Sequence, residues 1–201
     1  MRTKRIISIL PALAVLAWLT VAAATMQEPP KPPAEANHFV KDGLSFDYPT
    51  GWAMKDESTS QMQVLELSRG DHIIRVRAPR EWLKTPEKEA EAKRLIQDKY
   101  VNDFNEMLLQ GGLRPTRTSA VSEFGGGPAE GIKLRAMLDG APGGMDAFYR
   151  VLSDRFVQIS QIGSERDMVR SAAAWDLIRT SIKVEPPPTP GSTPAPAKKT
   201  P

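Results

Sequence analysis

The chain has 201 residues, of which 40% are hydrophobic and 25% are charged, and its formal net charge is +3. It contains no cysteine, which excludes disulfides and lipid attachment at a cysteine, so the fold must rest on core packing alone. Arg2, Lys4 and Arg5 account for the whole positive excess. The rest of the chain carries no net charge, and its composition gives no support for nucleic-acid binding.

The first 24 residues have the order of a secretory signal. The basic start is followed by an uncharged apolar run from Ile6 to Ala24, which ends in three alanines. This pattern predicts cleavage after Ala24 and an extracytoplasmic protein, periplasmic or secreted. The alternative is an uncleaved N-terminal membrane anchor, since the run approaches the roughly 20 apolar residues of a membrane span. Pro11 interrupts the apolar run and three alanines end it, and both features favour cleavage.

Proline-rich segments flank one predicted domain. Residues 25–37 are predicted to form a semi-rigid linker, and residues 186–201 a disordered tail that is too poor in apolar side chains to fold. The tail is interpreted as solvated; the alternatives are a spacer, a ligand for a proline-binding partner or a cell-wall attachment. Residues 38–185 are enough for a single buried core.

The domain begins with strand patterns. Leu44, Phe46 and Tyr48 alternate with polar residues, which predicts a half-buried strand that ends at the turn of residues 49–51. Similar patterns predict further strands, joined by short glycine-containing or polar turns. These strands cover residues 61–69, 72–80, 117–124, 130–138, 145–153 and 155–162.

Two helices interrupt the strands. Thr85 and Pro86 open the first helix and glycines 111 and 112 end it. Its expected buried stripe is Ala92, Ile96, Tyr100, Phe104 and Leu108. Ser164 and Asp167 form a capping box at the start of the second. Its expected stripe is Met168, Ala172, Trp175, Ile178 and Ile182. Hairpin-linked strands interrupted by helices indicate an antiparallel α+β fold.

The segment Gly43-Leu44-Ser45-Phe46-Asp47-Tyr48-Pro49-Thr50-Gly51-Trp52 resembles the opening of the PsbP-like superfamily, whose bacterial members include the DcrB-like exported envelope proteins. The order of predicted elements also matches, over about residues 39–184. The resemblance implies a curved antiparallel sheet of about six to seven strands packed between two main helices. It implies an accessory or binding protein rather than an enzyme. The matching motif carries no catalytic residues, so none are transferred.

The residues themselves predict no catalytic, metal or cofactor site. His38 and His72 are the only histidines, and they are expected to be two isolated, exposed side chains without the spacing of a metal set. The serines lack a nucleophile elbow. A Ser-His-Asp triad is assembled in space and so is not excluded by spacing alone. The glycines at 125–127 join two strands and are interpreted as a turn.

One group of cations suggests a binding surface. Arg75 and Arg77 share one face of their strand, Lys133 and Arg135 share one face of theirs, and Arg150 lies on a neighbouring strand. If these strands are adjacent and in phase, the five form a basic stripe on an exposed sheet face. Arginine forks suit carboxylate or phosphate groups, as in an anionic polymer, a lipid headgroup or an acidic partner. The alternative is an ordinary charged face turned to water.

Trp52 allows two interpretations. Because large aromatic side chains mostly serve burial, the first is that Trp52 packs in the core. The second is that Trp52 and Tyr48 line a pocket between the turn and the sheet. Trp82, before the long helix, is expected to be the more exposed aromatic residue.

Three functions are therefore compared. The leading hypothesis is an exported, non-enzymatic accessory protein of the bacterial cell envelope that binds another envelope protein. The second is a small-molecule or lipid-binding module with a pocket near Trp52 and Tyr48. The third, a hydrolase, ranks far below, because the sequence offers no assembled nucleophile.

Overall fold

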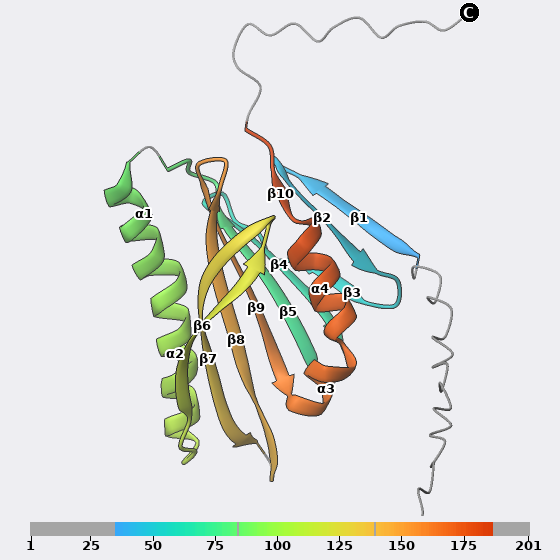
Figure 1. Cartoon of the computed structure of the whole chain (residues 1–201), viewed down its shortest axis with the longest axis vertical. Coiled ribbons are helices and arrows are strands. Elements are labelled where there is room, and N and C mark those ends of the chain that lie inside the picture. The colour runs from blue at the N-terminus through green and yellow to red at the C-terminus, as the bar shows by residue number, and fades with distance from the viewer. Residues whose placement is uncertain (1–34, 84, 139, 187–201) are drawn as a thin grey trace, which may run out of the picture. The chain divides into compact units, whose positions relative to one another are not determined.

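The computed structural model describes residues 35–83, 85–138 and 140–186 (Figure 1). The predicted signal of residues 1–24, most of the predicted linker and the tail beyond Pro186 lie outside these residues. In the part of the chain that is described, no helix has the length and apolar character needed to cross a membrane.

Seven antiparallel strands form the main sheet, in the order β3-β4-β5-β9-β8-β7-β6. Most neighbours are joined by tight two-residue turns, such as Ser153-Asp154, where both residues have positive φ. The strands are β3 (Ala53–Asp56), β4 (Met62–Arg69), β5 (His72–Pro79), β6 (Thr116–Phe124), β7 (Gly127–Leu138), β8 (Ala141–Leu152) and β9 (Arg155–Ser164).

A second, three-stranded sheet has the order β1-β2-β10. It contains β1 (Ala36–Lys41), β2 (Leu44–Pro49) and β10 (Lys183–Val184). The sequence predicted only β2 of these strands and placed the end of the linker at residue 37. The linker boundary was wrong, because β1 begins at Ala36, where it pairs with Pro49.

A long helix covers one face of the main sheet (Figure 1). It runs through α1 (Pro86–Ala92), a π-helical turn η1 (Lys93–Asp98) and α2 (Lys99–Gln110). The predicted cap is confirmed, since the Thr85 side chain accepts a hydrogen bond from the Lys88 amide. In the π-helical turn the Lys99 amide bonds back to the Arg94 carbonyl, five residues earlier. Such turns insert one extra residue into a helix and are frequent at functional sites.

The closing helix lies with the small sheet on the other face (Figure 1). It consists of α3 (Glu165–Arg170) and α4 (Ala172–Ser181), which are separated at Ser171. The predicted capping residue is confirmed, because the Ser164 hydroxyl accepts from the Asp167 amide at 3.1 Å.

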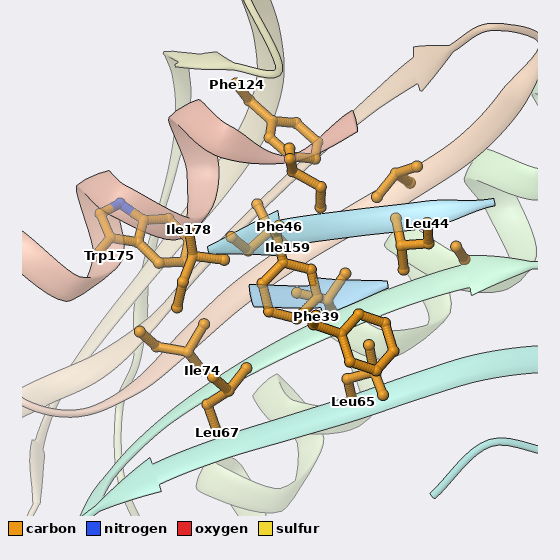
Figure 2. Packing of buried hydrophobic residues seen from close by; sticks show 14 of the residues in the cluster. Phe39, Leu44, Phe46, Leu65, Leu67, Ile74, Phe124, Ile159, Trp175 and Ile178 are labelled. Carbon is orange, nitrogen blue, oxygen red and sulfur yellow. The ribbon is translucent and has the colours of Figure 1, made fainter. Parts of the chain in front are cut away.

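The two faces of the main sheet bury different kinds of side chain. The face toward α4 and the small sheet carries the larger apolar core, with Phe46, Ile74 and Ile159 fully buried (Figure 2). The face toward the long helix combines two smaller apolar clusters with buried polar residues, among them Gln97 and Gln158. The predicted α+β architecture is thereby confirmed: seven antiparallel strands lie between the long helix and the closing helix.

Candidate functional site

The predicted basic stripe does not form, because strand order and phase both separate its members. Strands β9 and β8 lie between β5 and β7. Arg75 pairs with Ser160, whose hydroxyl is 3.5 Å from the Tyr100 hydroxyl of α2, so Arg75 faces the long helix. Lys133 alternates with Ile132 and Leu134, which pack on the long-helix side. Lys133 and its neighbour Arg135 therefore point to the opposite face, as does Arg150.

Arg75 and Arg77 lie on the face of the sheet that the long helix covers, and Arg77 contacts that helix. The Arg75 Nη2 atom lies 2.6 Å from the Glu66 carboxylate. The Arg77 guanidinium stacks 3.6 Å from the centre of the Tyr100 ring, and burial lowers its pKa below the ordinary value for arginine. Both cations have partners within the protein, which indicates a packing role at this interface.

On the α4 face, Arg135 and Arg150 also bind groups of the protein itself. Arg135 forms an ion pair of 2.6 Å with Asp146, which is almost fully buried. Arg150 donates to the carbonyl oxygens of Phe124 and Gly125, at 2.9 and 2.7 Å, and so fixes the turn between β6 and β7. Lys133 is half-buried and lies opposite Asp146 in the neighbouring strand.

Trp52 packs in the core, which confirms the first interpretation of this residue. It is buried, and its ring lies 5.5 Å from the ring of His72 in an edge-on arrangement. Tyr48 is partly buried against the same core. Neither residue lines the cavity described below.

The histidines differ from each other more than expected. His38 is exposed and its Nδ1 lies 2.5 Å from the Asp47 carboxylate. The expectation of an exposed His72 was wrong: the side chain is only 1% exposed, because Trp52 and β9 cover the corner of the hairpin. Within the described residues, no group of three or more His, Cys, Asp or Glu side chains could hold a metal ion.

The most distinctive polar residue is Arg155, the first residue of β9, which the sequence did not single out. Its side chain is 99% removed from solvent. It donates from Nε to the Pro79 carbonyl at 2.7 Å, from Nη1 to the Asp42 carbonyl at 2.9 Å, and from Nη2 to the Gln63 side chain and the Ala78 carbonyl. All four acceptors are uncharged groups, so no carboxylate neutralises the cation directly. Four of the five guanidinium N–H groups are used, which leaves one on Nη1.

Arg155 lines a cavity of about 440 Å³, which we call the arginine cavity. Its walls come from the turn between β1 and β2, the segment after β5, and the end of the described chain. The lining residues are Asp42, Gly43, Arg80, Trp82, Arg155, Glu185 and Pro186. Trp82 is half-buried, so its indole offers the wall a partly open aromatic surface.

A tight turn fixes the rim of the arginine cavity. Asp42 and Gly43 both have positive φ, at 51° and 76°. The Gly43 carbonyl accepts a hydrogen bond from the Glu185 amide at 2.8 Å. A Cβ atom on Gly43 would lie only 2.6 Å from the Glu185 carbonyl oxygen. Glycine is therefore required by both the backbone conformation and the close approach.

Arg80 and Asp42 form an ion pair on the rim. Arg80 Nη1 donates to the Asp42 carboxylate, and Arg80 Nε donates to the Thr59 carbonyl at 2.9 Å. The hydrogen bond from Arg80 lowers the pKa of Asp42 below its ordinary value. Burial lowers the pKa of Arg155 most strongly, and the positive charge of Arg80 lowers it further. The negative charge of Asp42 raises it.

These charges suit binding better than acid–base catalysis. The charged residues that line the arginine cavity are Arg80, Arg155, Asp42 and Glu185, which sum to no net charge, and Asp42 is already committed to Arg80. General acid–base catalysis favours a pKa near the working pH, whereas the pKa of Asp42 is shifted further down. An added anion would relieve the charge on Arg155, because a buried cation without a direct counter-ion is energetically costly.

Comparisons with known proteins identify a solved structure with a similar fold. No protein-family model matches the chain, and a search of curated proteins also finds no match. Among solved structures, the chain is similar to the solution structure of cyanobacterial PsbP (CyanoP) from Synechocystis sp. PCC 6803. The TM-score is 0.52 and the sequence identity 15%, and the match covers 76% of this chain and 94% of that one. The protein therefore has a PsbP-like fold, as the Gly43–Trp52 segment suggested.

Proposed function

We propose that this protein is an exported, non-enzymatic accessory protein of the bacterial cell envelope, and that it binds an anionic group of a partner protein in the arginine cavity. The basic and apolar pattern of residues 1–24 supports export. The PsbP-like fold supports an accessory role, since that resemblance implies binding rather than catalysis.

The observation that carries this proposal is the position of Arg155. An almost fully buried guanidinium with only neutral acceptors borders a cavity that also contains Arg80, the indole of Trp82 and the carboxylates of Asp42 and Glu185. Guanidinium groups bind carboxylates and phosphates through charge-assisted hydrogen bonds, which are roughly twice as strong as neutral ones. The free N–H on Arg155 Nη1 and the Nη2 group of Arg80 supply donors for one such anion.

The competing hypothesis of a small-molecule or lipid site at Trp52 receives less support. Trp52 is buried among apolar residues of the core, so a ligand there would have to displace existing packing. We therefore place the proposed site at the arginine cavity.

The experiment is an affinity capture from solubilised envelope material with residues 25–201, compared among wild type, Arg80→Gln and Arg179→Gln. Arg179 is a matched control, because it also forms an ion pair with an aspartate and donates to a backbone carbonyl. We expect one protein to be retained by wild type and Arg179→Gln and lost from Arg80→Gln. Identical capture by all three proteins would contradict the proposal.

A further inference from the structure

The main sheet ends in two unlike edge strands. β3, at one edge, has only four residues, of which Lys55 and Asp56 are charged. β6, at the other edge, has nine residues, and its central residues 118–122 are uncharged. A short, charged edge strand discourages pairing with another chain, whereas a long and uncharged one invites it. β6 is therefore the edge of the main sheet that is better suited to accept a further strand.

The hairpin between β6 and β7 determines which backbone groups of β6 point outward. Its two-residue turn, Gly125-Gly126, has φ angles of 55° and 78°, as in a type I′ turn. The flanking residues Phe124 and Gly127 therefore form a hydrogen-bonded pair, and such pairs alternate along the ladder with pairs that are not hydrogen-bonded. The residues of β6 whose backbone groups point away from β7 are Arg117, Ser119, Val121 and Glu123.

Two contacts agree with this orientation of the β6 backbone. Pro128, which lies opposite Glu123, has no N–H to donate to β6. The Glu123 carbonyl instead accepts a hydrogen bond from the side chain of Arg179 in α4. In the part of the chain that the structure describes, the outward backbone groups of Ser119 and Val121 have no protein partner. Water or a further strand must supply their hydrogen bonds.

The sequence of β6 is complementary to itself when two copies run antiparallel. With Ala120 on the two-fold axis, Arg117 of each copy lies opposite Glu123 of the other. In the same register, Ser119 lies opposite Val121. All of these residues have outward backbone groups, so each opposed pair can be a hydrogen-bonded pair, and opposite charges across such a pair are stabilising. Shifting one strand by two residues removes the Arg–Glu pairs, so the charges select one register.

The side chains of Arg117 and Glu123 are available for this pairing. Because an even number of residues separates them, they lie on the same face of the sheet. This is the face of the long helix, where Arg117 donates to the Asn102 side chain at 2.8 Å. Both are exposed, and among the described residues neither forms an ion pair. Val121, on the same face, is 73% exposed, and pairing would cover part of it.

We propose that this protein forms a two-fold symmetric homodimer, in which the β6 strands of two copies pair antiparallel about Ala120 and join the main sheets into one. The partner is a second copy of this chain, because the charges of β6 match those of β6 itself and a two-fold axis uses each contact twice. A single strand pair buries less surface than a permanent interface does, so the dimer is reversible. The inference is independent of the arginine cavity, since β9, β8 and β7 separate β6 from β5.

The test is sedimentation velocity of residues 25–201 at low ionic strength, from about 10 μM to about 1 mM. Wild type should shift from monomer toward dimer over this range. Arg117→Glu and Glu123→Arg should each dimerise at least roughly tenfold more weakly, because one substitution sets like charges opposite each other at two symmetric positions. Lys55→Glu, on the exposed β3 edge, is the charge-reversal control and should dimerise as wild type does. Circular dichroism verifies that each variant is folded.

Mixing the two single variants is the decisive measurement. In a mixed dimer the two acidic positions of Arg117→Glu lie opposite the two basic positions of Glu123→Arg, so the equimolar mixture should dimerise although each variant alone does so poorly. Three results would overturn the proposal: a wild type that stays monomeric up to about 1 mM, a dimer that neither variant weakens, or a mixture no more dimeric than its components.

Discussion

The guanidinium of Arg155 donates a hydrogen bond to the side-chain oxygen of Gln63, and the two residues are 92 positions apart in the chain. Gln63 is fully buried and in turn donates to the Lys41 carbonyl at 2.9 Å. This chain of polar contacts connects β9, β4 and β1, and so ties the main sheet to the small sheet beneath the arginine cavity.

Replacing Arg155 by methionine should destabilise the protein. Arg155→Met removes four hydrogen bonds and leaves the Gln63 oxygen and three carbonyls without their donor, so we expect a loss of about 2–4 kcal/mol in the free energy of unfolding. Urea unfolding, monitored by circular dichroism, measures this loss of stability. Arg170→Met is the control, since Arg170 is exposed and makes only a long ion pair of 3.7 Å with Asp167. Equal stability of the two variants would contradict the structural role.

Gly43 should tolerate alanine much less well than Gly51 does. Both have positive φ, at 76° and 81°, so both variants incur backbone strain. Only Gly43→Ala also places a Cβ against the Glu185 carbonyl, whereas the space around Gly51 is open. We expect Gly43→Ala to be the less stable of the two by about 1–2 kcal/mol. A smaller difference in stability between the two variants, measured by thermal unfolding, would mean that the turn and the end of β10 are not in close contact.

Burial of His72 should make stability depend on pH. Desolvation lowers its pKa below the ordinary value of 6.5, while Gln161 and Asp167 act weakly in the opposite direction. The unfolded chain therefore binds the proton more readily than the folded one. The contribution of His72 is complete above a pH of about 6.5 and declines as the pH falls toward the lower pKa of the folded state.

His72→Leu removes this contribution. Urea midpoints measured from about pH 7.5 down to pH 5 should fall less steeply in His72→Leu than in wild type. His38→Gln is the control, because His38 is exposed. In this variant the urea midpoint should retain the part of its pH dependence that His72 causes. If His72→Leu and wild type have the same slope, His72 is not buried in its neutral form.

Gln97 and Gln158 should show strong energetic coupling. Gln158 Nε2 donates to Gln97 Oε1 at 2.8 Å, and Gln97 donates to the Ala147 carbonyl, which attaches the π-helical turn to the sheet. Gln97→Leu leaves Gln158 buried without its partner, at a cost of about 1–3 kcal/mol. The double variant with Gln158→Leu should be more stable than the sum of the single effects predicts. Additive effects in urea unfolding would contradict the contact.

Local patterns predicted both main helices and seven of the ten strands in the described residues, but missed β1, β3 and β10 and could not predict how the strands pair. The alternation of Leu44 and Phe46 gave β2 correctly, because strand periodicity depends on neighbouring residues alone. Whether Arg75 and Arg135 share a face depends on the strand order, which places β9 and β8 between their strands. Arg155 follows a polar turn and looks exposed in the sequence. Its burial arises from the turn between β1 and β2 and from β4, which are distant in the chain.

The central claim is that the arginine cavity binds an anion, and the most direct measurement is a titration of ¹⁵N-labelled residues 25–201 with acetate at constant ionic strength, followed by NMR. The predicted result is saturable shifts at the amides of Gly43, Arg80, Trp82 and Arg155, which disappear in Arg80→Gln and persist in Arg179→Gln. Shifts that are unsaturable, or scattered over the surface and the same in both variants, would contradict the account.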